Sequence, residues 1–275
     1  MHLLKIYWEP STVLFKIGTF GIHYYSLMFV IAFALGYRMM RKMHEKEHVS
    51  TEGLDPMLTY IVLSTLVGAR LGHVFFYDWA YYQNHLLEIF LPIATQPEGG
   101  FSFVGFRGLA SHGAAIGILI GIILYQRNYG YKSLLWILDR LIIPTTLGAA
   151  FVRIGNFFNS EIVGNYTGNN FGVIFVNRGE NLPRHPAQLY EALGYFILFF
   201  VLRKLYQQGA GQKQGFLLGV FMSVLFSIRF LVEFVKESQG GFETFLPALS
   251  TGQWLSVPLI IAGIIVMRKT QSSTN

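Results

Sequence analysis

The sequence contains no cysteine among its 275 residues. A chain without thiols has no disulfide bond, no thiolate metal site and no cysteine nucleophile. Charged residues are also scarce, at 13% of the chain against about a quarter in an ordinary soluble domain. Hydrophobic residues make up 52%. This composition predicts an all-α polytopic membrane protein.

Basic residues outnumber acidic residues in the sequence. The formal net charge is +6, which suits contact with anionic lipid head groups, so membrane lipids are expected partners. No basic run is interleaved with aromatic residues on a soluble face, as a nucleic-acid surface requires. Nucleic acid is therefore not an expected partner.

Long apolar stretches set the predicted architecture. Spanning a bilayer takes roughly 17–25 mostly apolar residues, and about seven stretches qualify. We predict a single integral membrane domain over residues 1–275 with about seven transmembrane helices. The predicted spans are 24–41, 57–77, 109–126, 134–153, 187–203, 215–235 and 252–267.

Lysine and arginine predict the orientation, because cytoplasmic connections carry an excess of both. They cluster at alternate connections and at the C-terminal end. The C-terminus is therefore predicted to be cytoplasmic and the N-terminus to lie outside. The basic clusters lie at 38–46, 127–132, 203–213 and 268–269.

The outward connections are long and rich in aromatic residues and glycine. We expect them to form a small outward-facing, periplasmic cap of loops and short strands, from about 78–108 and 154–186. Within it, 165–183 is typical of a turn-bounded strand pair. Residues 101–106 predict either a short strand or a segment that dips into the membrane interface.

Polar clusters interrupt the outer ends of the predicted spans. The fourth span ends in F-V-R-I-G-N-F-F-N-S-E-I-V-G at 151–164. Ionisable residues in a membrane are costly, and they mark functional sites. Five further clusters fall at the same predicted depth, so we expect one site between helices. They are Tyr24-Tyr25, residues 68–73, 107–113 and 184–191, and the set Arg229, Glu233 and Lys236.

Some of these residues have a purely structural alternative. Arg229 and Glu233 are spaced for an internal ion pair. His112 alone is typical of a core histidine that bonds a carbonyl. Arginine nevertheless dominates the clusters and favours bidentate contact with phosphate. A phospholipid head group is therefore the predicted ligand.

These motifs resemble a known family. The segment R-I-G-N-F-F-N-S-E-I-V-G at 153–164 is similar to the hallmark motif of bacterial prolipoprotein diacylglyceryl transferases. The other motifs follow in the family's order, so the resemblance covers nearly the whole chain. They are H-Y-Y at 23–25, G-A-R-L-G at 68–72, R-G-L-A-S-H-G at 107–113, R-H-P-A-Q-L-Y-E at 184–191, R-F-L-V-E-F at 229–234 and G-Q-W-L-S at 252–256.

The resemblance implies a multi-pass transferase of the bacterial inner membrane that acts in lipoprotein biosynthesis. The family transfers a diacylglyceryl group from phosphatidylglycerol to the thiol of a lipobox cysteine in a prolipoprotein signal peptide. A thioether forms and glycerol phosphate leaves. The attacking sulfur belongs to the substrate, in keeping with a chain that has no cysteine. No cofactor and no metal are expected.

The resemblance also assigns residues. Arg153 and Arg229 would hold the lipid phosphate, and His112 is the candidate base. Lys236 stands where the family often has a third arginine, which puts bidentate contact there in doubt. The expected catalytic residues are Tyr25, His112, Arg153 and Arg229; those expected to bind phosphatidylglycerol are Arg153, Asn156, Glu161, Gly164, Arg229 and Glu233.

A lipid or anionic-solute transporter is the alternative function. Intramembrane arginines suit it, but a transporter of the inverted-repeat kind shows two related halves with broken helices at the midplane. The sequence shows no internal repeat, and its polar clusters gather at one face. Formation of a modified lipobox peptide discriminates between the two hypotheses.

Overall fold

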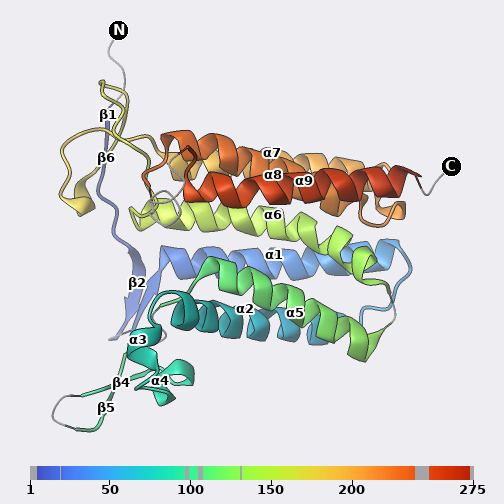
Figure 1. Ribbon diagram of the computed structural model, residues 1–275, viewed down its shortest axis with the longest axis horizontal. Helices are drawn as coiled ribbons and strands as arrows, with labels where there is room; N and C mark the ends of the chain where they lie inside the picture. Colours follow the sequence, from blue (N-terminus) through green and yellow to red (C-terminus); the bar gives the residue numbers. More distant parts are fainter. Residues whose placement is uncertain are drawn as a thin grey trace. The chain divides into compact units, whose positions relative to one another are not determined.

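The computed structural model describes residues 5–18, 20–96, 99–104, 108–130, 132–238 and 248–272, so Arg107 of the motif 107–113 lies outside the described residues. The protein is mostly helical, and each predicted span coincides with a helix (Figure 1). These helices are α1 (Tyr24–Lys46), α2 (Leu54–Phe76), α5 (Ser111–Tyr129), α6 (Leu134–Phe158), α7 (Ala187–Gln207), α8 (Phe216–Val232) and α9 (Thr251–Ser272).

Four helical segments in the described part of the chain are long and apolar enough to cross a membrane. Apolar side chains cover these helices because a lipid-facing helix has no polar solvent to meet. The four segments are Leu54–Phe76, Leu134–Phe158, Phe216–Val235 and Thr251–Thr270.

The remaining elements are short and connect the helices. Two short α-helices and two strands lie between α2 and α5, and three 3₁₀ helices lie in the second half of the chain. They are α3 (Trp79–Tyr82), α4 (Leu87–Phe90), β1 (Lys5–Trp8), β2 (Val13–Ile17), β3 (Phe20–His23), β4 (Ile93–Thr95), β5 (Phe101–Phe103), β6 (Gly172–Phe175), η1 (Val176–Arg178), η2 (Ala210–Gln212) and η3 (Glu233–Val235).

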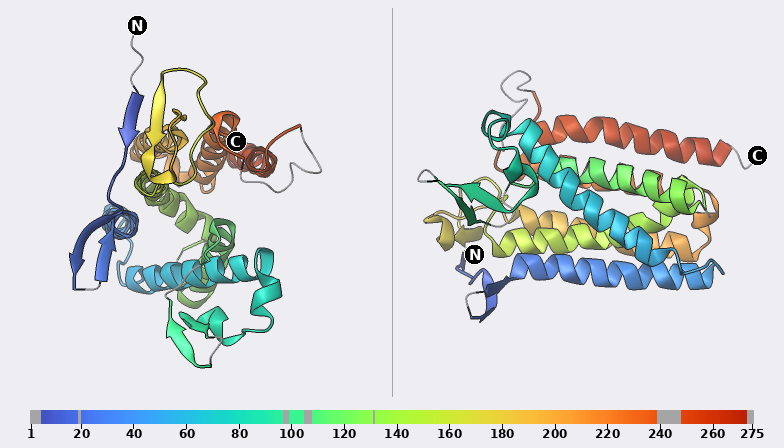
Figure 2. Two further views of the ribbon diagram at one scale, coloured as in Figure 1. Left: turned by 90° about the vertical axis from the view of Figure 1, so that its left-hand side faces the viewer. Right: turned by 90° about the horizontal axis from the view of Figure 1, so that it is seen from below.

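The predicted strand pair within 165–183 is wrong. Only β6 forms there, and it pairs in parallel with β1, from Lys5 opposite Gly172 to Trp8 opposite Phe175 (Figure 2). Val173 and Phe175 of β6 belong to a small cluster of buried apolar residues, against which Trp8 packs. The partner of β6 is therefore β1, near the N-terminus, and not a neighbouring strand within 165–183.

The chain divides into two compact units, residues 1–43 with 135–275 and residues 44–134. In the second unit α2 and α5 lie side by side, with glycines where their backbones meet (Figure 1). A Cβ atom added to Gly72 would lie 2.7 Å from the Cα of Gly113. Small residues permit this close approach, which is a common way for membrane helices to associate.

Gly72→Ala is therefore expected to destabilise the α2–α5 pair by about 1–3 kcal/mol, because backbone atoms must move apart. The matched control is Gly148→Ala in α6, where the new Cβ would lie 3.4 Å from the Cβ of Ala32, an ordinary contact. Both substitutions replace glycine with alanine inside a helix, so the gain in helix propensity is the same. The difference in stability between the two variants therefore measures the effect on helix packing. Thermal unfolding in detergent measures it, and equal unfolding temperatures would contradict the prediction.

In the first unit, α8 packs against both α7 and α9. The carboxylate of Asp139, near the start of α6, accepts hydrogen bonds from the backbone N–H groups of Gly215 (2.6 Å) and Leu218 (2.8 Å). These N–H groups belong to the first turn of α8, where no helical carbonyl is available to them. Asp139 thus caps α8 and joins its start to the start of α6.

Candidate functional site

Arg153 lies one turn before the end of α6, and its side chain is largely buried. Its Nε forms an ion pair with Oε2 of Glu191, which is on α7 and only 1% exposed. Its Nη1 donates a hydrogen bond of 3.1 Å to Oδ1 of Asn156 on the next turn of α6. A buried arginine needs such partners because an unpaired charge in an apolar environment is costly. The guanidinium plane is therefore held from two sides.

The buried charges continue beyond Glu191. Its Oε1 lies 3.8 Å from Nζ of Lys236, and the same Nζ lies 3.3 Å from Oε2 of Glu233. The order is therefore Arg153, Glu191, Lys236, Glu233, with alternating signs. Glu233 pairs with Lys236, and the alternative pair of Glu233 with Arg229 does not occur among the ion pairs of the described residues.

Glu161 lies where the chain turns back after α6. Its Oε1 accepts hydrogen bonds from Nδ2 of Asn156 (2.7 Å) and of Asn159 (3.4 Å). Ser160 (φ 55°) and Ile162 (φ 57°), on either side, have left-handed backbone conformations. Such conformations are uncommon outside glycine and costly for a β-branched residue, and they gather at functional sites. The strained turn points the Glu161 carboxylate at Asn156.

Gly164 ends the same motif, and its backbone is tightly enclosed. Its N–H donates to the carbonyl of His185 at 2.9 Å. A Cβ atom at this position would lie 2.5 Å from that carbonyl oxygen and 2.7 Å from the carbonyl oxygen of Val235. Only glycine fits between two backbone segments at this spacing. Gly164 thus brings the loop after α6 against the residue that precedes Lys236.

Tyr25, at the start of α1, joins this group through Gly155. A Cβ atom on Gly155 would lie 2.8 Å from Cδ2 of the Tyr25 ring, so the ring lies directly on the glycine. The Tyr25 hydroxyl interacts electrostatically with Glu161 and with Arg153. The neighbouring Tyr24 stacks on Phe158, with ring centroids 4.4 Å apart.

Arg229 extends the site to α8. Within the described part of the chain its buried Nε has no hydrogen-bond partner. The charges of Arg229 and Arg153 both act on the hydroxyl of Tyr195, a buried residue of α7. A buried donor without an acceptor costs about 1–3 kcal/mol, more when the group is charged. An anionic ligand at Arg229 would remove that cost.

His112 belongs to the other unit. It is the second residue of α5, its side chain is exposed, and its ring centroid lies 5.5 Å from that of Phe76 and 5.6 Å from that of Tyr77. The alternative of a buried core histidine is therefore wrong. The first unit holds all the other residues that the sequence assigns to the site: Tyr25, Arg153, Asn156, Glu161, Gly164, Arg229 and Glu233.

The sequence interpretation missed three contributors to this group. Glu191 and Gln188 lie in the motif 184–191, which was noted without a role for either. Gln188 donates from Nε2 to the carbonyl of Glu161 at 2.7 Å. Tyr195 lies one turn beyond Glu191. The available signal was a glutamate at a helix start in an apolar segment, which needs a cationic partner.

Arg178 and Arg184 stabilise the loop that follows α6 through ion pairs. Arg184 pairs with Glu180 (2.5 Å) and Glu237 (3.1 Å), and Arg178 pairs with the same two carboxylates at 2.9 and 3.2 Å. Partial burial raises the pKa of Glu180, but the hydrogen bonds and charges of both arginines outweigh it and hold that pKa below its usual value. The four charges join the loop after α6 to the end of η3.

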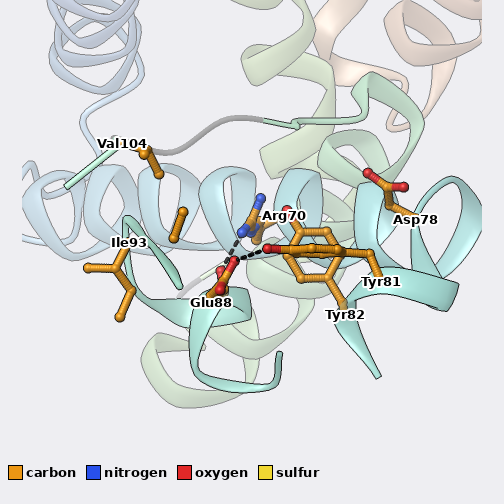
Figure 3. A pocket seen from close by; sticks show the side chains of 8 residues that line it. Arg70, Asp78, Tyr81, Tyr82, Glu88, Ile93 and Val104 are labelled. Carbon is orange, nitrogen blue, oxygen red and sulfur yellow. Dashed lines mark hydrogen bonds between the residues drawn. The ribbon is translucent and has the colours of Figure 1, made fainter. Parts of the chain in front are cut away.

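Arg70, in the unit formed by residues 44–134, has a different environment. Its Nε donates to the carbonyl of Ile89 at 2.9 Å, its Nη2 donates to the carbonyl of Glu88, and its guanidinium lies 4.7 Å from the centroid of Tyr82. It lines a cavity of about 310 Å³ beside α3 and α4 (Figure 3). Arg70 therefore holds the short helix α4 in place.

Comparison with known proteins agrees with this geometry. The family model for prolipoprotein diacylglyceryl transferase matches residues 12–268. A phosphatidylglycerol–prolipoprotein diacylglyceryl transferase of Tolumonas auensis is 42% identical over 262 residues, 95% of this chain and 96% of its own length. Proteins of the same name from Bacteroides fragilis and Chloroherpeton thalassium are each 40% identical, over 96% and 95% of this chain and 95% and 93% of their own lengths. The chain therefore belongs to the prolipoprotein diacylglyceryl transferase family.

Proposed function

We propose that this chain transfers the diacylglyceryl group of phosphatidylglycerol to the lipobox cysteine thiol of prolipoprotein signal peptides. Membership of a transferase family and the names of its relatives support the activity and both substrates. The observation in the site that carries the proposal is the buried Nε of Arg229, without a partner among the described residues, in the unit that holds Arg153. Two guanidinium groups at the outer ends of α6 and α8 suit a phosphodiester between them.

The reaction is a substitution at the glycerol carbon that bears the phosphodiester. The sulfur forms the new C–S bond, and the C–O bond to phosphate breaks with its electron pair staying on glycerol phosphate. The thiol is a poor nucleophile until it loses its proton, which His112 accepts. Arg153 and Arg229 donate hydrogen bonds to the phosphate as its charge develops.

Five further residues shape the binding site. Nδ2 of Asn156 donates a hydrogen bond of 2.7 Å to Glu161, and Oδ1 of Asn156 accepts one from Arg153. These two residues therefore form one side of the proposed site, next to the guanidinium group of Arg153. Glu191 fixes Nε of Arg153 and so orients its remaining donors. Gly164 allows the loop after α6 to pack against the backbone at His185 and Val235, and Glu233 balances the charge of Lys236.

The arrangement in the membrane is part of the same proposal. All seven long helices cross the bacterial inner membrane, and residues 1–275 form one integral membrane domain. The segments of about 78–108 and 154–186 form a cap of loops and short strands on the outer face. The helix lengths, from 17 to 25 residues, and the lysines and arginines at alternate connections support this arrangement.

The orientation gives a direct prediction. A reporter that is active only in the cytoplasm, fused after Asn275, is expected to be active, because the basic end of α9 stays inside. A fusion of the same reporter within the loop 165–171 serves as the opposite control and is expected to be silent. Activity of the loop fusion together with silence of a well-expressed C-terminal fusion would reverse the orientation.

The activity is tested with the purified chain in vesicles that contain labelled phosphatidylglycerol and a synthetic lipobox peptide. The expected product is a peptide heavier by one diacylglyceryl group, attached through a thioether. A peptide with serine in place of its cysteine, and vesicles without phosphatidylglycerol, are the controls. Unmodified peptide with movement of label between leaflets would favour the transporter.

A further inference from the structure

The short helix α4 buries its one charged side chain, together with Ile89, and exposes its two other apolar side chains. Glu88 is 4% exposed and points inward, whereas Leu87 is 62% exposed and Phe90 65% exposed. A short helix in water buries its apolar side chains and leaves its charge in solvent. The Glu88 carboxylate accepts a hydrogen bond of 2.8 Å from the hydroxyl of Tyr81 (Figure 3). It also accepts hydrogen bonds from the backbone N–H and the hydroxyl of Thr95, at 2.8 and 2.6 Å.

The hairpin of β4 and β5 also exposes large apolar side chains. Along β5, Phe101 and Phe103 are exposed, Phe103 by 82%, while Ser102 between them is partly buried and its hydroxyl lies 3.5 Å from the carbonyl of Ala94. Successive side chains of a strand point to opposite faces. Both phenylalanines of β5 thus lie on one exposed face of the hairpin, while Ser102 lies on the other face, opposite Ala94.

Charge is nearly absent from this region. Between residues 79 and 104 the sequence has no lysine and no arginine, and its glutamates are Glu88 and Glu98. Glu88 is buried, and Glu98 lies outside the described residues. Exposing an uncharged apolar surface to water is unfavourable, and such a surface usually marks an interaction site.

The position of this surface indicates what covers it. Figures 1 and 2 show α3, α4 and the β4–β5 hairpin at the end of α2 that carries Phe76. That helix is one of the segments long and apolar enough to cross a membrane, and its last turn exposes Phe75 and Phe76. Trp79 and Tyr81 follow, both exposed, as in the aromatic belt at a membrane interface. The apolar surface therefore begins at head-group depth.

We propose that α4 and the β4–β5 hairpin insert into the outer leaflet of the membrane, with Leu86, Leu87, Phe90, Leu91, Phe101 and Phe103 among the lipid chains. The partner is the lipid bilayer itself. Interfacial segments of this kind bury their apolar face at the boundary between head groups and acyl chains. Arg70 and Glu88, on the inner side, keep the segment folded against α2.

Because the chain has no cysteine, single thiols test this directly. The variants are Phe90→Cys and Phe103→Cys, with Leu63→Cys as the reference within α2, Asn181→Cys as the exposed loop reference and Ser102→Cys as the inward-facing control. Each is reconstituted in vesicles of phosphatidylethanolamine and phosphatidylglycerol. The readouts are the reaction rate with a membrane-impermeant maleimide and, after spin labelling, relaxation by oxygen and by a water-soluble nickel complex.

The thiols at 90 and 103 are expected to react at least about tenfold more slowly than the thiol at 181, because the reactive thiolate is disfavoured in an apolar environment. Their spin labels should favour oxygen over nickel as the label at 63 does, and the label at 102 should not. Rates equal to that at 181 would overturn the proposal. Protection that appears only with an added signal peptide, or that depends on the protein-to-lipid ratio, would overturn it too, in favour of a peptide or a second copy of this chain.

Discussion

Turnover of the lipobox peptide is expected to fall about 10²–10³-fold when Arg153 is replaced by lysine, the usual cost of losing one fixed donor to a developing charge. Lysine keeps the positive charge but loses the planar fork. In the protein Nε and Nη1 already have different partners, Glu191 and Asn156, which a single ammonium group cannot replace in the same geometry. A loss of turnover in this variant would therefore be due to the geometry of the guanidinium group and not to its net charge.

Arg140→Lys is the matched control, since it makes the same change in the same helix. Arg140 is buried near the other end of α6 and lies 4.4 Å from the centroid of the Trp136 ring. Turnover by that variant is expected to stay near normal. Unfolding temperatures in detergent show whether each variant is folded. Near-normal turnover in a folded Arg153→Lys variant would mean that the residue acts only as a point charge.

His112→Gln is expected to lower turnover about 10²–10⁴-fold while phosphatidylglycerol still binds, since this is the usual worth of general-base catalysis. Glutamine keeps a polar group of similar size but accepts no proton. The exposed position of His112 at the start of α5 is open to an incoming thiol.

His73→Gln is the control for this experiment. His73 is on α2 and stacks on Tyr77, one of the two rings that His112 also approaches, so the change has a similar effect on ring packing. Turnover by this variant is expected to stay near that of the parent protein. If a folded His112→Gln variant loses little activity, His112 is not the base. The field of the two arginines would then be what activates the thiol.

The sequence predicted the helices well because long apolar runs leave few alternatives. All seven predicted stretches are mainly helical. Most of the helices are longer than the predicted stretches, as in α1, which continues through the basic residues to Lys46, whereas α8 is shorter and continues as η3. Contacts within one helix were also predictable. Arg153 and Asn156 lie three positions apart on α6, and the expected shared face is confirmed by their 3.1 Å hydrogen bond.

Contacts between distant segments could not be predicted in the same way. The pair of Arg153 with Glu191 depends on how α6 packs beside α7, and no local pattern encodes that choice. The β1–β6 pair joins two segments that are far apart in the sequence, where the sequence suggested a local hairpin. Lys236 was in doubt as a replacement for arginine, yet it bridges Glu191 and Glu233 as a compact ammonium group.

The cap that Asp139 places on α8 has a consequence for the two arginines. The carboxylate fastens the start of α6 to the start of α8, and Arg153 and Arg229 lie near the opposite ends of these same helices. The separation of the two guanidinium groups is thus a property of the resting protein. For the phosphate site proposed between Arg153 and Arg229, this means that the two donors are in place before the lipid arrives, so little conformational entropy would be lost on binding.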